Sequence, residues 1–575
     1  MIIPAAAPFD RSEPWRGKPS SRRAIVPGIA LAAAGSGALT AVHYHRLGLT
    51  LSHYDARGHL VVARRIFDNI TPGWQQVGAV WLPLPHLLNA LPVQIDLFYR
   101  TGASAVALSI LSFAVATGAI AWIVSALTES RVAAVVAATV FAANPNVLYL
   151  QSTPMTEPLL LALTLLGVAL LVDQAALPPS RDSRFGGPRK GCATSTNVCE
   201  ANRTFSDSRT RSAGLPASAG PPIDPAAARH AEAPEERRWQ ACPGDRTRVA
   251  GWVLALACLT RYEAWPVTAT ALAFAVWACG RRGEALDTAV RRIGRIALYP
   301  AVALIAFVIF SRIVVGRWFV SGDFFVPENK ALADPWLAAK EIAWGVRMLS
   351  GPLLYVIGLF GFVGLLAIGA FNRARASALV VVSVVAMAAI PWAAFVKGHP
   401  YRIRYMVPLL AVEAIGAGAV VGLSRRARGA VAVAVLAAVA YELRPLDAGA
   451  PMVVEAQWDR PNVPLRAQVT ACIGPPQRGV KIMASMGSLG HHMQEMSRAG
   501  FEIRDFLHEG NGDLWLTAID GPYPFAQWIL IEEKAQGGDV LARIAREHPH
   551  FLDGYRRVCE GAGLALYKRR VGVGE

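Results

Sequence analysis

The chain has 575 residues, of which 53% are hydrophobic and only 17% are charged, against about 25% in ordinary soluble domains. Apolar runs recur from Ala24 to Tyr441, and several reach the length of roughly 20 residues that crosses a bilayer. Composition therefore excludes a soluble globular protein and predicts a polytopic α-helical membrane protein. The net charge of +16 could indicate nucleic acid, but basic residues that orient membrane spans explain it better, so we expect no nucleic-acid partner.

Hydropathy predicts membrane spans at 24–44, 102–127, 131–150, 156–173, 293–315, 351–371, 377–396, 404–423 and 429–443. A further apolar stretch, from Val249 to Cys279, is interrupted by the sequence TRYE and has basic residues at both ends. This pattern predicts a hairpin of two short helices, because the alternative of one kinked helix would place charges inside the bilayer at a cost of several kcal/mol. We therefore expect about 11 transmembrane or half-membrane helices within residues 24–445.

Basic residues place the N-terminal tail 1–23 in the cytoplasm, and the loops 45–101, 316–350 and 397–403 then fall outside. The segment 174–248 is rich in Pro, Gly, Ser and Arg and has little hydrophobic periodicity. It is predicted to be a disordered cytoplasmic insertion.

Residues 446–575 have the pattern of a small soluble α/β domain. Strands are predicted at 480–486, 501–507, 528–533 and 565–570, with helices after the first strand and at 537–548. The domain is expected in the periplasm if the short apolar run before it crosses the membrane. Cys472 and Cys559 could then form a disulfide, although two unrelated thiols fit the sequence equally well.

The first candidate catalytic group is Asp55, in the segment LSHYDARGHLVVARR just beyond the first span, with His53 and Tyr54 before it. An isolated aspartate in a loop is usually a solvated charge. However, Glu157 is expected on the same face, at the first turn of a span, where a carboxylate is also favoured by the helix dipole alone. Two carboxylates near one membrane surface would suit deprotonation and orientation of a hydroxyl group.

The second candidate group is cationic. The short external segment KGHPYRIRYMVPLL carries Lys397, Arg402 and Arg404, against the usual distribution of charge. Arginine matches phosphate oxygens with a planar fork of donors, so a lipid phosphate is a candidate ligand, while snorkelling to headgroups is the alternative. Arg261 in the TRYE sequence has the same two interpretations, with Glu263 as a candidate partner.

Other signals are weaker. His86 could contact a substrate or a metal, but a lone histidine is more often structural, and the pair at 491–492 is equally weak. The sequence has no Walker motif, dinucleotide fingerprint or HExxH motif, so neither ATP hydrolysis nor nicotinamide chemistry is supported. No cofactor is assigned, and a divalent cation stays open because Asp55 and Glu157 alone cannot complete a coordination shell.

Taken in order, the first span, YDA, WLPLPHLL, TPMTEPLLL, ACLTRYEAWPV and YRIRYMVPLL resemble the membrane glycosyltransferases of the GT-C superfamily. The resemblance covers roughly residues 24–445 and is closest to the protein O-mannosyltransferases and lipid A aminoarabinose transferases. Each motif alone is loose, and specificity lies in the whole set. The C-terminal domain and the insertion lie outside the resemblance.

The resemblance implies a sugar donor linked to polyprenyl phosphate and transfer at the outer face of a bacterial inner membrane. Asp55 would then be the catalytic base, Glu157 would help to position a substrate, and Arg402 and Arg404, with Tyr405 beside them, would hold the donor phosphate. Ala56 stands where many mannosyltransferases have an acidic residue, which leaves open the acceptor class (lipid, glycan or protein).

Two other functions compete with this expectation. A transporter or flippase of lipid-linked sugars would use the same arginines, but it would not need a base in the first loop, and the chain shows no convincing internal repeat. A sensor or assembly subunit would depend on the C-terminal domain for binding.

Overall fold

The computed structural model describes residues 24–77, 81–177, 243–316, 318 and 329–570. The predicted cytoplasmic tail 1–23 and most of the predicted insertion 174–248 lie outside the described residues. Among the described residues, seven helical stretches are long and apolar enough to cross a membrane, which supports the prediction of a membrane protein. They are α2 (Ile25–Arg46), α6 (Ala103–Thr128), α9 (Glu157–Ala176), α12 with a π-helical turn (Leu286–Val314), α14 (Pro352–Phe371), η5 with α15 (Arg373–Val396) and η6 with α16 (Ile403–Leu423).

Shorter helices pack against these spans and against one another. They are α7 (Arg131–Ala142), α8 (Pro145–Leu150), α10 (Pro243–Cys258), α11 (Ala264–Arg281), α13 (Pro335–Ser350) and α17 (Arg428–Glu442). The predicted hairpin is present as two helices, α10 and α11, with the TRYE sequence between them. The total of about 11 is neither confirmed nor contradicted, because α17, with 15 residues, is shorter than a bilayer requires.

Two details of the membrane part differ from the sequence prediction. The expected span 131–150 is broken between α7 and α8, because Asn144 caps α8 through its side chain and Pro145 opens it. Helix α13 occupies part of the expected loop 316–350, where Asp334 caps the helix and Pro335 follows. In both places a capping side chain followed by proline starts a helix, and hydropathy alone does not detect this signal.

Close helix packing holds the segment before α16 in place. Helix α14 packs along α16, and a Cβ atom on Gly416 would collide with the carbonyl of Gly358. Small residues allow two membrane helices to approach to backbone contact. The start of α16, and with it η6 (Ile403–Leu409), is therefore fixed against the membrane part.

The predicted external loop 45–101 contains three helices, α3 (Tyr54–Arg64), α4 (Leu84–Ala90) and α5 (Asp96–Thr101), with short 3-10 turns η1 (Trp74–Gln76) and η2 (Pro92–Gln94). His53 caps α3, since its Nδ1 accepts a hydrogen bond from the backbone N–H of Asp55 at 3.1 Å. This cap makes Asp55 part of the first turn of a helix, where the dipole favours its negative charge.

The C-terminal domain has a five-stranded sheet in the order β2-β1-β3-β5-β4, in which β1 is parallel to β2 and β3, and β5 is antiparallel to β3 and β4. Its elements are α18 (Pro451–Glu455), α19 (Asn462–Ala471), β1 (Ile482–Ala484), α20 (Met486–Met496), β2 (Phe506–Leu507), α21 (Asp513–Asp520), β3 (Trp528–Glu532), α22 (Val540–Glu547), β4 (Tyr555–Gly561) and β5 (Leu564–Arg569). The predicted strands near β1, β3 and β5 and both predicted helices are confirmed. The predicted strand 501–507 is wrong except for its last two residues.

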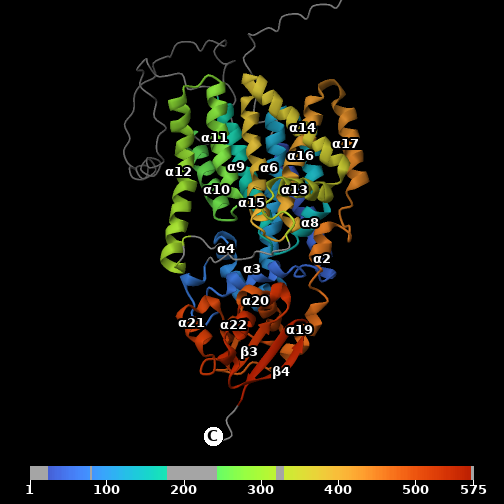
Figure 1. Cartoon of the computed structure of the whole chain (residues 1–575). Helices are drawn as coiled ribbons and strands as arrows, with labels where there is room; N and C mark the ends of the chain where they lie inside the picture. The colour runs from blue at the N-terminus through green and yellow to red at the C-terminus, as the bar shows by residue number, and fades with distance from the viewer. Residues whose placement is uncertain (1–23, 78–80, 178–242, 317, 319–328, 571–575) are drawn as a thin grey trace, which may run out of the picture. The chain divides into compact units, whose positions relative to one another are not determined.

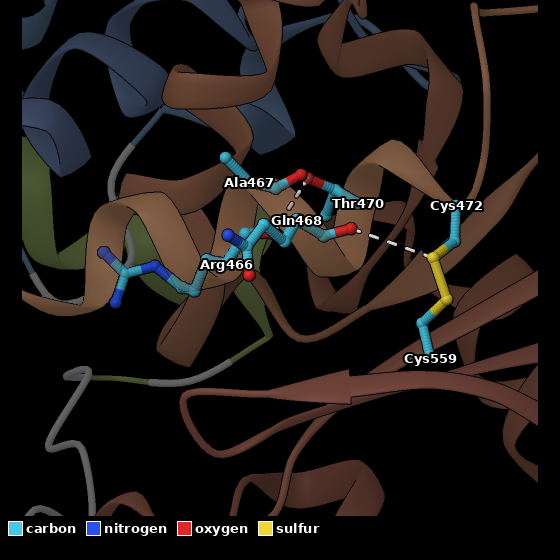
Figure 2. The surroundings of a disulfide bond; sticks show 6 residues. All are labelled: Arg466, Ala467, Gln468, Thr470, Cys472 and Cys559. Carbon is cyan, nitrogen blue, oxygen red and sulfur yellow. Dashed lines mark hydrogen bonds between the residues drawn. A yellow bond between two sulfur atoms is a disulfide. The ribbon is translucent and has the colours of Figure 1, made fainter.

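A disulfide between Cys472 and Cys559, which are 87 positions apart in the sequence, joins the end of α19 to β4 (Figure 2). Thr470 also donates a hydrogen bond to the backbone carbonyl of Arg466, one turn earlier in α19. The sequence left open a disulfide or two unrelated thiols, and the structure has the disulfide. Such a bond persists in oxidising compartments.

The C-terminal domain packs on the first loop, with α20 against α3 (Figure 1). One buried apolar cluster contains Leu60 and Val61 of α3 together with Leu489 and Met493 of α20. Asp68 accepts hydrogen bonds from the backbone of Ile503 and Arg504. The two segments therefore share one core.

Candidate active site

Asp55 forms an ion pair with Arg404, which lies in η6 at the start of the last long span. The two side chains are only 11% and 7% exposed. Burial alone would raise the pKa of Asp55, but the guanidinium of Arg404 and the nearby His53 and Arg402 outweigh it and lower that pKa below its usual value. Asp55 is therefore a carboxylate at neutral pH.

Arginine and aromatic side chains surround this ion pair. The guanidinium of Arg404 lies 5.0 Å from the ring centre of Tyr405, and its Nη2 donates a 3.4 Å hydrogen bond to that hydroxyl. The guanidinium of Arg402 lies 5.9 Å from the ring centre of Tyr54 and 5.6 Å from that of Trp458. The buried Nε–H of Arg404 has no hydrogen-bond partner among the described residues, so this donor is free for an anionic ligand.

Glu157 and Arg261 form a second charged cluster at the start of α9. Arg261 donates hydrogen bonds of 3.0 Å to Glu157 and to Thr156, and one of 2.7 Å to Glu263. The Glu157 side chain is fully buried. Because two carboxylates engage Arg261 through all three of its nitrogens, Arg404 and Arg402 offer more free donors for a phosphate than Arg261 does.

His59 lies one turn after Asp55 on α3 and contacts His86. Its pKa is well below the usual value, first because of burial and then because of His86, Arg261 and Arg404. Its Nδ1 lies 3.1 Å from Nε2 of His86. His59 is thus a buried histidine in contact with His86 and one helical turn from Asp55, and the sequence interpretation did not select it.

The C-terminal domain also contributes to the site. Glu455 of α18 accepts a hydrogen bond from the backbone N–H of Ile403 at 3.0 Å and lies 3.6 Å from Nε2 of His53. It therefore connects the helix that carries Asp55 to the segment that carries Arg404. His491 of α20 lies edge-on to Tyr54, with the ring centres 6.4 Å apart.

The sequence interpretation missed His59, Glu455 and Trp458, and it judged His491 a weak signal. His59, His491 and Glu455 have no local sequence pattern that indicates a site. They belong to it only through contacts with residues that are distant in the sequence. Among the described residues, no group of three or more His, Cys, Asp or Glu side chains is arranged to hold a metal ion. Asp55 and Glu157 are each bound to an arginine instead.

Comparisons with known proteins add little to this geometry. No protein-family profile and no curated protein sequence matches the chain. Among solved structures, the chain is similar to the oligosaccharyltransferase of Archaeoglobus fulgidus in its apo form, with 12% sequence identity and a TM-score of 0.44 over 92% of this chain and 73% of the other. Similarity at this level does not by itself indicate a shared activity.

Proposed function

We propose that the chain is a membrane glycosyltransferase that moves a sugar from a polyprenyl-phosphate donor to an acceptor hydroxyl at the outer face of a bacterial inner membrane. The observation that carries this proposal is the buried ion pair of Asp55 and Arg404. It places an ionised carboxylate next to a guanidinium that has a free donor. Proton abstraction needs a positioned carboxylate, and stabilisation of a leaving phosphate needs cationic donors.

The reaction follows from the chemistry of these groups. Arg404 and Arg402 would neutralise the negative charge that grows on the lipid phosphate as the bond to the sugar breaks. Asp55 would take the proton from the incoming hydroxyl, and that oxygen would form the new bond to the anomeric carbon. Glu157, held by Arg261, would position a substrate hydroxyl, as would His53 and Tyr54 beside Asp55. One direct displacement would invert the anomeric centre.

The disulfide supports the orientation. Because the bond between Cys472 and Cys559 requires an oxidising compartment, the C-terminal domain would lie outside the cytoplasm. The site shares that side, since Glu455 and His491 of this domain contact the residues next to Asp55.

The test compares glycolipids and glycoproteins, by mass spectrometry, from cells with the gene, without it, and with variant genes. We expect a sugar adduct that disappears in the deletion and in Asp55→Asn, which removes the negative charge but keeps a similar shape. Asp287→Asn is the matched control, because Asp287 is 65% exposed and pairs with Arg291 on its own helix. The adduct should return in full with Asp287→Asn.

Transfer by purified protein in detergent, where no compartments exist, separates an enzyme from a transporter. Near-normal transfer by a correctly folded Asp55→Asn variant would remove Asp55 from the mechanism. Loss of the adduct in cells without any transfer activity in detergent would favour a transporter of lipid-linked sugars.

A further inference from the structure

Two buried histidines form a hydrogen-bonded chain next to the ion pair of Asp55 and Arg404. His59 Nδ1 lies 3.1 Å from His86 Nε2, and His86 Nδ1 lies 3.0 Å from the carbonyl oxygen of Leu82. The ring of Trp81 packs against His59 with centres 4.1 Å apart. His59 and Asp55 are four residues apart on α3 and therefore share one helix face.

The hydrogen-bond partners determine which ring nitrogen of each histidine carries the proton. Burial lowers the pKa of His86 to about 3 and that of His59 well below its usual value, so both rings are neutral at pH 7. The carbonyl of Leu82 can only accept, so His86 carries its proton on Nδ1 and accepts at Nε2. His59 must then donate from Nδ1, which leaves its Nε2 as an unprotonated acceptor.

Among the described residues, this acceptor, Nε2 of His59, has no hydrogen-bond partner. His59 and His86 line a cavity of about 20 Å³ together with Asn89, Ser109 and Thr156. That volume fits one water molecule or one hydroxyl group.

We propose that Nε2 of His59 accepts a hydrogen bond from a substrate hydroxyl, and that His86 is a positioning residue that fixes the required tautomer. The inference rests on the proposed function, which supplies a hydroxyl either on the donor sugar or on the acceptor. Thr156 in the cavity wall bonds to Arg261, so the hydroxyl would sit beside the cluster of Arg261 and Glu157. His86 would thus act through His59 instead of touching the substrate.

Two substitutions of His59 separate this role from packing. In His59→Gln the side-chain amide reaches the position of Nε2 and offers an oxygen acceptor there. In His59→Asn the shorter amide mimics Nδ1, which preserves the bond to His86 but removes the acceptor. With lipid extracts of the deletion strain as substrate source, we expect His59→Gln to keep at least a third of wild-type transfer and His59→Asn to lose at least tenfold.

The identity of the hydroxyl follows from saturation kinetics of His59→Asn. A raised KM for the lipid-linked sugar assigns the hydroxyl to the donor, and a raised KM for the acceptor assigns it to the acceptor. Equal transfer by the two variants, with an active wild-type protein, would overturn the inference alone. Absence of transfer by the wild-type protein would overturn the proposed function.

The tautomers can be read without any activity. Solid-state NMR of the full chain labelled with ¹⁵N-histidine, with His59→Asn and His86→Gln used for assignment, should show His59 protonated at Nδ1 and bare at Nε2. The opposite tautomer, or a charged imidazolium at pH 7, would overturn the inference. In His86→Gln, whose amide can still accept from His59 and donate to Leu82, transfer should stay within threefold of wild type.

Discussion

A largely buried group of four charges joins the C-terminal domain to α3, and removal of one charge should weaken this contact. Arg57 of α3 pairs with Glu495 of α20 and lies 4.0 Å from Asp459. Arg466 binds Asp459 through two hydrogen bonds of 2.7 and 2.6 Å and lies 3.6 Å from Glu495. The two positive and two negative charges balance, and Glu495→Gln leaves one positive charge in excess.

The magnitude follows from burial. The side chains of Arg57, Arg466 and Glu495 are 7%, 4% and 12% exposed, so water screens the excess charge poorly. Removal of one partner from a buried ion pair costs about 3–5 kcal/mol. At the lower end, the free energy of local opening falls by about 3 kcal/mol, which corresponds to a roughly hundredfold faster exchange of protected amides.

Hydrogen exchange of the whole chain in detergent, resolved by mass spectrometry of peptides, measures this effect. We expect faster exchange in α20 and α3 and unchanged exchange in β3, which lies in the middle of the sheet. Glu547→Gln, at an exposed position of the same domain, makes the same charge change and should leave α20 unaltered. Equal exchange of α20 in both variants would refute the reasoning.

A double-mutant cycle tests whether the charges act together. Arg57→Gln combined with Glu495→Gln restores the balance of charge, so its effect on exchange should be smaller than the sum of the two single effects. Because Arg57 is two residues from Asp55 on the same helix, we also expect transfer to fall in parallel with the protection of α20.

Two further predictions concern the C-terminal domain. Cys472 and Cys559 should not react with a maleimide in denatured protein that has not been reduced, and labelling of both without reductant would contradict the disulfide. Reduction should lower the free energy of unfolding of the domain by roughly 4–5 kcal/mol, because it removes a constraint on the entropy of the unfolded chain. Burial lowers the pKa of His508 to about 3 from 6.5, so between these pH values the unfolded state binds one more proton and stability falls as pH falls. His508→Asn, whose amide oxygen can still accept from the N–H of Gly510 as His508 does, should reduce this slope by up to about 1.4 kcal/mol per pH unit in thermal unfolding.

The membrane spans could be predicted from the sequence because bilayer thickness sets a minimum apolar length. The predicted strand at 501–507 was wrong because Glu502 and Asp505 form a capping box that closes residues 503–505 into a 3-10 turn, a local signal that alternation does not reveal. Strand β4 was missed because most of its side chains are exposed or half-buried, so that no apolar run marks it.

The site was only partly predictable, for a different reason. Asp55, Glu157 and the arginines stood out because charges are rare in apolar sequence. Their pairing was not readable, because it depends on contacts across the chain; Arg57 and Glu495, for example, are 438 residues apart. Glu455 joins the segments of Asp55 and Arg404, yet in the sequence it is one acidic residue among many.

The ion pair also couples donor binding to base strength, if the proposed function holds. In the free protein Arg404 helps to lower the pKa of Asp55, which makes Asp55 a weak base. A lipid phosphate bound to Arg404 would offset the positive charge and add a negative one nearby, so the pKa of Asp55 should rise and its basicity increase. The carboxylate would then become an effective base only when the donor is in place.

This coupling is visible in pH profiles, because kcat/KM reports on the free enzyme and kcat on the substrate complex. We expect the acidic limb of kcat to lie at least one pH unit above that of kcat/KM. Arg404→Lys keeps the charge but loses the planar fork of donors, so it should bring the two limbs closer together. If the two limbs coincide in the wild-type protein, donor binding does not change the pKa of Asp55. The donor phosphate would then not bind close enough to Arg404 to offset its charge.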